Sequence, residues 1–124
     1  MRRYTTLAME SRGDIRCITL DRPERRNAFD SRMISELTQA FDESAQEPSL
    51  RGVLLSSAGP VFCAGADLQW MQSTSPISEA QAQDDAHRLT RMFRAIDECP
   101  CPVIARVQGP AFGGGLGLMA VCDI

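Results

Sequence analysis

Alternating apolar and polar positions open the chain and predict β-strands. Residues 4–10 and 14–20 both alternate, and the turn at 12–14 between them contains a glycine, which is typical of an antiparallel hairpin. A later run, 52–57, is short and apolar, as in a buried strand of a mostly parallel sheet, and residues 103–107 are expected to form the next strand. The pattern therefore predicts a hairpin followed by two further strands.

Between these strands the apolar period changes to that of amphipathic helices. The first helix is expected to start at Asp30 or Ser31 as its N-cap and to end before Pro48. A later helix should open at the capping box formed by Ser78 and Gln81. The predicted helices cover residues 30–47, 67–72, 78–99 and 114–121. Strands that alternate with helices in this order indicate an α/β protein wound around a sheet.

The composition excludes several classes of protein. The 124 residues are 44% hydrophobic and 23% charged, with a net charge of −3 and no basic stripe of the kind that binds nucleic acid. Five cysteines without a C-x-x-C pair, together with one histidine, provide too few ligands for a zinc site. The sequence contains neither a membrane-spanning run nor a signal peptide pattern, so we expect a soluble, cytoplasmic protein with free thiols.

Two glycine-rich turns are the most informative part of the sequence. Residues 62–68 (FCAGADL) and 109–117 (GPAFGGGLG) each place small residues where a predicted strand turns into a helix. Backbone N–H groups at a helix N-terminus lack intrahelical partners, and glycine lets a ligand approach them closely. Two such donors converging on one oxygen would form an oxyanion hole.

The sequence and spacing of these turns argue against two nucleotide-binding motifs. The second turn lacks the Gly-Lys-Ser/Thr of a phosphate loop, and its G-x-G-x-x-A match to a dinucleotide fingerprint begins eight positions after Val107, too far from the strand. Close helix–sheet packing without a ligand remains an alternative for the glycines, and helix capping is favoured over catalysis for Asp67. A Cys63 nucleophile is rejected because His87 is expected on a solvated helix surface.

Four segments taken together resemble the enoyl-CoA hydratase/isomerase (crotonase) superfamily. In the family's order they are 20–29 (LDRPERRNAF), 62–68 (FCAGADL), 102–109 (PVIARVQG) and 111–123 (AFGGGLGLMAVCD). The resemblance implies the ClpP/crotonase fold, a spiral of β-β-α units, and reaches only the N-terminal half of the family's domain. We therefore expect residues 1–124 to be the N-terminal part of a single domain, incomplete because the C-terminal half is absent.

The same resemblance assigns roles to individual residues. It places the oxyanion hole at the backbone N–H groups of Ala66 and Gly114, which would polarise the thioester carbonyl of an acyl-CoA. Substrate contacts are implied for Arg25, Ala28, Ala64, Gly65, Asp67, Leu68, Gly113 and Gly117. The arginines at 22, 25 and 26 are expected to contact phosphate, with an ordinary solvated cluster as the alternative. No metal and no resident cofactor are implied, since coenzyme A arrives as part of the substrate.

The implied reaction is the addition of water to a 2-enoyl-CoA. Residues 66–72, 84–87 and 113–118 resemble the methylglutaconyl-CoA / carboxygeranoyl-CoA hydratase branch, which suggests a 3-methyl-branched substrate and leucine degradation. Well-known hydratases carry a glutamate at the position of Gly117, and their second glutamate would lie beyond Ile124. An isomerase of the same family, which needs one base, and a non-catalytic truncated fragment are therefore alternatives. Full-length family members assemble as trimers or as dimers of trimers.

Overall fold

One mixed sheet forms the centre of the chain, whose computed structural model describes residues 4–67, 70 and 79–124. Its strands are, in spatial order, β1 (Leu7–Arg12), β2 (Ile15–Leu20), β3 (Gly52–Ser57) and β4 (Val103–Ala105). β1 and β2 are antiparallel, whereas β3 pairs in parallel with both β2 and β4. The predicted hairpin and the predicted parallel pairing are thus both confirmed.

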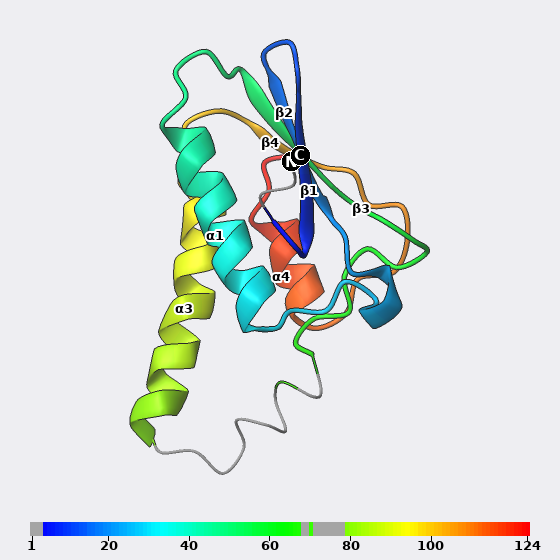
Figure 1. Ribbon diagram of the computed structural model, residues 1–124, viewed down its shortest axis with the longest axis vertical. Coiled ribbons are helices and arrows are strands. Elements are labelled where there is room, and N and C mark those ends of the chain that lie inside the picture. The colour runs from blue at the N-terminus through cyan, green and yellow to red at the C-terminus, as the bar shows by residue number, and fades with distance from the viewer. Residues whose placement is uncertain (1–3, 68–69, 71–78) are drawn as a thin grey trace.

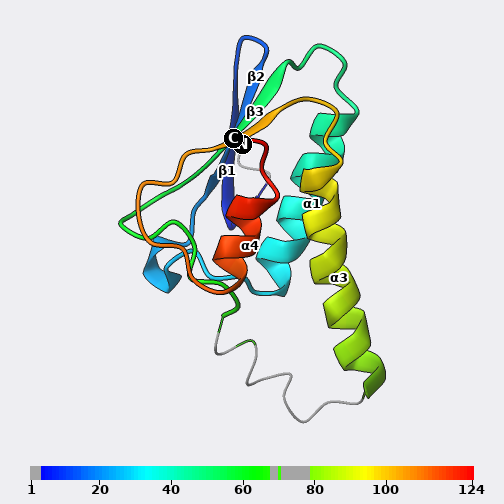
Figure 2. The same ribbon diagram turned by 180° about the vertical axis from the view of Figure 1, so that it is seen from behind.

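Helices cover one side of this sheet, as Figures 1 and 2 show from opposite directions. They are α1 (Ser31–Ala45), α3 (Glu79–Asp97) and α4 (Gly114–Ala120), and a short 3-10 helix spans Pro23–Arg25. α1 and α3 run side by side and pack against each other. None of the helices that the structure describes is long and apolar enough to cross a membrane.

The hydrophobic core lies between the sheet and these helices. Each strand and each α-helix contributes fully buried side chains, and the largest of them include Leu7, Ile18, Leu55, Phe41, Met92 and Leu118. Phe29 and Phe62, which flank the predicted site segments, are buried in the same cluster. Removal of this apolar surface from water is the main stabilising contribution, and it also anchors the loops that carry the glycine-rich turns.

The N-terminus of α1 begins as the sequence predicts. The backbone of Asp30 is extended, and its Oδ1 accepts a hydrogen bond of 2.8 Å from the backbone N–H of Met33. This is the geometry of an N-cap, in which a side-chain oxygen satisfies an otherwise unpaired amide of the first turn. The capping box expected at Ser78 and most of the short helix expected over 67–72 lie outside the described residues.

Two strands differ from their predicted bounds by two residues or more, for identifiable reasons. β4 ends at Ala105 rather than at residue 107, because the chain turns towards Gly109, whose backbone lies against that of Pro60. β1 begins at Leu7 rather than at residue 4, because the amides of the two preceding residues are bound by a side chain of α1.

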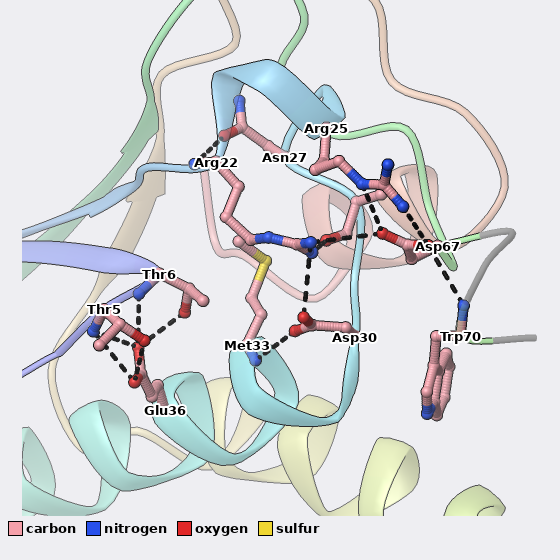
Figure 3. Close-up of polar contacts among 11 residues, drawn as sticks. Thr5, Thr6, Arg22, Arg25, Asn27, Asp30, Met33, Glu36, Asp67 and Trp70 are labelled. Atoms are coloured by element: carbon pink, nitrogen blue, oxygen red, sulfur yellow. Dashed lines mark hydrogen bonds and ion pairs between the residues drawn. The ribbon is translucent and has the colours of Figure 1, made fainter. Parts of the chain in front are cut away.

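That side chain is Glu36, which ties the start of β1 to α1. Its carboxylate accepts hydrogen bonds from the backbone amides of Thr5 (3.1 Å) and Thr6 (2.8 Å) and from both threonine hydroxyls. Figure 3 shows all of these bonds converging on the one carboxylate. Burial raises the pKa of Glu36, but the hydrogen bonds from Thr6 and Thr5 outweigh burial and hold the pKa below its usual value.

We predict that Glu36→Gln destabilises the chain by about 2 kcal/mol at neutral pH, because hydrogen bonds to a charged acceptor contribute more than neutral ones. Since the folded pKa is depressed, the stabilisation is fully present above the unfolded pKa and is lost as pH falls through the folded pKa. Chemical denaturation at pH 7 and pH 3 should therefore show a difference between wild type and variant that shrinks at pH 3.

The matched control is Glu10→Gln, because the side chain of Glu10 is 60% exposed and pairs with Arg12 at the surface. It should change stability by less than about 1 kcal/mol at either pH. Equal losses in the two variants would contradict the role assigned to the buried carboxylate.

Candidate functional site

Backbone hydrogen bonds bring together three segments that are far apart in the sequence. The Phe29 N–H donates to the Gly65 carbonyl (2.7 Å), and the Asp67 N–H donates to the Phe29 carbonyl (2.7 Å). The Phe112 N–H donates in turn to the Cys63 carbonyl (3.0 Å). Short parallel bridges at Phe29–Ala66 and at Cys63–Ala111 result. The two glycine-rich turns, which the sequence singled out separately, therefore lie side by side.

The contact between the two turns requires glycine. Gly65 has φ of +87°, and a Cβ placed on it would lie 2.8 Å from the carbonyl oxygen of Phe112 and 3.0 Å from the nitrogen of Gly114. A side chain at 65 would thus meet backbone rather than a movable side chain. The absence of a Cβ lets the first turn approach the start of α4.

Ala66 and Gly114 carry N–H groups that the described part of the chain leaves without an acceptor. The backbone groups that flank Ala66, the Gly65 carbonyl and the Asp67 amide, both bond to Phe29, so the Ala66 N–H faces the other edge of its segment. Gly114 is the first residue of α4, and the first amides of a helix have no intrahelical partner. Neither donor is therefore engaged by another group of the described chain.

A cavity of about 500 Å³ opens beside the first turn. It is lined by Glu24, Arg25, Arg26, Ala28, Ala64, Ala66, Asp67 and Phe112. Five of the residues expected in the site therefore share its wall, and Gly65 joins this wall to Gly113 and Gly114 through the contact described above. Leu68, also expected in the site, lies outside the described residues.

The Asp67 side chain is held inside the site by two arginines (Figure 3). It is 4% exposed, and its carboxylate lies 3.2 Å and 3.3 Å from two nitrogens of Arg25 and 3.4 Å from Nη2 of Arg22. Its Oδ1 also accepts a hydrogen bond from the Trp70 backbone N–H at 3.2 Å. The last bond has the spacing of a helix cap, as predicted, whereas the ion pairs were not foreseen.

Arg22 turns inward instead of standing in solvent. Its side chain is 14% exposed, its Nη1 donates to the Ala28 carbonyl (2.6 Å), and its Nη2 lies 3.4 Å from Asp30 Oδ2 as well as from Asp67. The alternative of an ordinary solvated cluster is therefore wrong for Arg22. Arg25 is more exposed, at 36%, and lines the cavity together with Arg26, so a phosphate contact for these two residues stays a prediction.

Asn27 is a buried site-forming residue that the sequence reading missed. Its φ is +56°, and its side-chain nitrogen donates to the Ala58 and Val61 carbonyls (2.8 and 2.9 Å) while its oxygen accepts from the Arg22 N–H (2.8 Å). Asparagine is among the few residues that tolerate positive φ, and this preference was the available signal. The side chain ties the loop before α1 to the loop after β3.

Gly117 lies at a helix contact rather than on the wall of the 500 Å³ cavity. A Cβ placed on it would lie 3.3–4.0 Å from three ring atoms of Phe93, so the glycine lets α4 approach α3. The Phe93 ring packs edge-on against Phe29, with centroids 6.3 Å apart. The expected contact of Gly117 with substrate stays a prediction. On the side where a Cβ would lie, the nearest described atoms are those of the Phe93 ring.

Cysteine chemistry does not fit this site. Cys63 is fully buried, and burial raises the pKa of its thiol to about 11, so the nucleophilic thiolate is scarce at neutral pH. His87 is exposed on α3. Among the described residues no group of three or more His, Cys, Asp or Glu side chains is placed to hold a metal ion.

Known proteins that resemble this chain are named as enoyl-CoA hydratases or as a dienoyl-CoA isomerase. A sequence model described as enoyl-CoA hydratase/isomerase matches residues 10–124. The chain is 43% identical over 107 residues to "Probable enoyl-CoA hydratase echA6" of Mycobacterium bovis, and the match covers 86% of this chain and 40% of that protein. It is 35% identical over 117 residues to the mitochondrial Delta(3,5)-Delta(2,4)-dienoyl-CoA isomerase of Rattus norvegicus, covering 86% of the chain and 35% of the relative.

The fold agrees with a solved structure of the same kind. The crystal structure of an enoyl-CoA hydratase from Shewanella pealeana superposes with a TM-score of 0.95 at 38% identity, covering 98% of this chain and 46% of that one. The chain thus spans less than half the length of each of the proteins compared.

We predict that Gly65→Ala is much more damaging than Gly13→Ala, although both positions have positive φ (+87° and +62°). At Gly13 a Cβ meets nothing within 4 Å, so the variant should lose only the conformational cost of about 1–2 kcal/mol. At Gly65 the Cβ also overlaps backbone, and the loss should reach about 3 kcal/mol or more. Urea denaturation of the two variants measures the difference, and equal losses would contradict the close contact of the two turns.

Proposed function

The chain belongs to the enoyl-CoA hydratase/isomerase family, and we propose that it carries the thioester-binding part of an enzyme that acts on 2-enoyl-CoA substrates. The observation that supports this proposal most directly is the pair of backbone donors at Ala66 and Gly114. They lie on turns in backbone contact, beside a cavity, and are left without an acceptor within the described chain.

These two donors suit a thioester carbonyl whose charge grows during the reaction. When water adds to C3 of the enoyl group, a carbon–oxygen bond forms there and the π electrons move onto the thioester oxygen, giving an enolate. A proton then returns to C2. N–H groups held by the protein stabilise the enolate oxygen more than the neutral carbonyl, by about 3 kcal/mol for each donor in comparable enzymes.

The arginines at the rim of the cavity suit the phosphates of coenzyme A. Arg25 and Arg26 line the same cavity as Ala66, and Arg25 is partly exposed. A guanidinium presents several N–H donors in one plane, which matches the oxygens of a phosphate. We therefore place the nucleotide end of the substrate at Arg25, Arg26 and Ala28 and the thioester at Ala66.

The proton chemistry of the reaction requires a group besides these donors. The carboxylates on the cavity wall are Glu24 and Asp67, and Asp67 is engaged by both arginines. We propose that the water-activating carboxylate lies outside residues 1–124. The share of each relative that the chain spans supports our proposal that these residues form the N-terminal part of a larger single domain. Assembly of that domain as a trimer or hexamer is proposed from the family resemblance alone.

We propose that the reaction is hydration and that the substrate is a 3-methyl-branched 2-enoyl-CoA, as in leucine degradation. Isomerisation is the second candidate, and two observations favour it. Gly117 has no side chain that could act as a base, and one of the relatives is named a dienoyl-CoA isomerase. Both reactions pass through an enolate, so both use the same pair of backbone donors.

Carbonyl recognition can be tested by calorimetric titration with two ligands that differ at one group. Butyryl-CoA carries the thioester carbonyl, whereas S-butyl-CoA, its thioether, lacks it. Two hydrogen bonds should make the thioester bind tighter by a factor on the order of 10 to 100. Equal affinity for the two ligands would contradict the proposed oxyanion hole, whereas weak but unequal binding would still support it.

We predict that Arg25→Gln weakens both ligands equally, by about tenfold, because a charge-assisted contact to phosphate is lost while the carbonyl donors remain. The affinity of the variant should also fall less steeply with salt than that of wild type. Arg12→Gln serves as the control, since this side chain is 75% exposed on the hairpin. A loss confined to the thioester ligand would contradict the phosphate assignment of Arg25.

A further inference from the structure

We propose that Asp67 is a positioning residue, whose buried carboxylate, held by Arg22, fixes the turn that carries the Ala66 N–H. This inference rests on the proposed function, because it concerns how one of the two carbonyl donors is aimed. It assigns to Asp67 a role that acts through Ala66 rather than through contact with the reacting atoms.

The residues before Asp67 have no side chain that could hold the turn. They are Ala64, Gly65 and Ala66, and Gly65 has a positive φ that glycine adopts freely. The backbone of this stretch is tied to Phe29 on either side of Ala66, at the Gly65 carbonyl and at the Asp67 amide. Asp67 is therefore the first described position after the flexible glycine at which a side chain anchors the turn.

Arg22 is the fixed partner of this anchor. Its guanidinium reaches the Ala28 carbonyl (2.6 Å), Asp30 (3.4 Å) and Asp67 (3.4 Å). It therefore connects the loop before α1, the N-cap of α1 and the turn at residues 64–67 that carries the Ala66 N–H. Figure 3 shows Arg22 between the two carboxylates. Because the Arg22 side chain is only 14% exposed, its position is set by the surrounding protein, and water competes little for its hydrogen bonds.

Arg25 plays a different part at the same carboxylate. Its side chain is 36% exposed and lines the cavity, so it can exchange Asp67 for an anionic ligand at the surface. Asp67 would remain neutralised by Arg22 when Arg25 moves. In this proposal Arg22 holds the turn formed by residues 64–67, whereas Arg25 can turn towards a phosphate.

The test compares wild type with Asp67→Asn, a variant of nearly equal shape that lacks the charge. Butyryl-CoA and S-butyl-CoA are titrated into each protein, and the ratio of the two affinities isolates the carbonyl contribution. We expect this ratio to fall about fivefold or more in Asp67→Asn, since a misdirected donor loses most of its hydrogen bond. A purely structural role would weaken both ligands alike and leave the ratio unchanged, which would overturn the proposal.

Amide hydrogen exchange provides a second readout that needs no ligand. The Phe29 amide, which donates to Gly65, should exchange about tenfold faster in Asp67→Asn if the turn is released. The Val53 amide, which donates to the Pro102 carbonyl in the sheet, should be unchanged. Equal acceleration at Phe29 and Val53 would indicate general destabilisation and would overturn the positioning role.

Two further variants complete the design. Arg22→Lys keeps the positive charge but replaces the two separate Nη atoms, one on the Ala28 carbonyl and one on the carboxylates, by a single nitrogen, so it should reproduce the fall in the affinity ratio. Asp42→Asn removes the carboxylate of another arginine pair, with Arg91 at 2.8 Å on the surface between α1 and α3, and should leave the ratio unchanged. A wild-type ratio of one would overturn the proposed function itself, whereas a ratio in Asp67→Asn equal to that of wild type would overturn the positioning role alone.

Discussion

Backbone contact between the Gly65 turn and the start of α4 is the constraint on which the rest of the site depends. A Cβ on Gly65 would lie 2.8 Å from one backbone oxygen and 3.0 Å from the Gly114 nitrogen, so the two turns meet without any side chain between them. Both turns are carried by buried residues, Phe62 on one side and Leu118 on the other. The hydrophobic core therefore sets the distance between the turns, and the glycine permits it.

The charges around this contact are balanced within the protein. Arg22 and Arg25 face Asp67 and Asp30, so two positive and two negative groups occupy a partly buried region. Removing charged groups from water is costly unless they are paired and hydrogen-bonded, and here a backbone carbonyl and a backbone amide satisfy further donors and acceptors. The network joins the three loops through the side chains of Arg22 and Asp67.

A site built from backbone donors has a particular chemical consequence. Amides have no pKa in the physiological range, so their ability to polarise an oxygen does not vary with pH, and their direction depends on the fold alone. Precision then has to come from the surrounding packing and ion pairs. On the proposed positioning role, the carboxylate of Asp67 with its two arginine partners supplies this precision directly after the Ala-Gly-Ala stretch.

Local patterns in the sequence determined the elements and many of the candidate residues. The alternation over the hairpin, the cap at Asp30 and the small residues of both turns all follow from rules that act within a few positions. The family resemblance also named Ala66 and Gly114, and the structure leaves the N–H groups of both without an acceptor among the described residues.

The tertiary structure alone decided how distant groups meet. Neither the pairing of Arg22 with Asp67 nor the tie between Asn27 and the loop after β3 can be read from spacing, because these partners are separated by about 30 to 45 positions. The packing of Gly117 against Phe93 likewise depends on where α4 crosses α3. Sequence periodicity specifies which face of an element is apolar, whereas the contacts across that face arise only when the whole core is assembled.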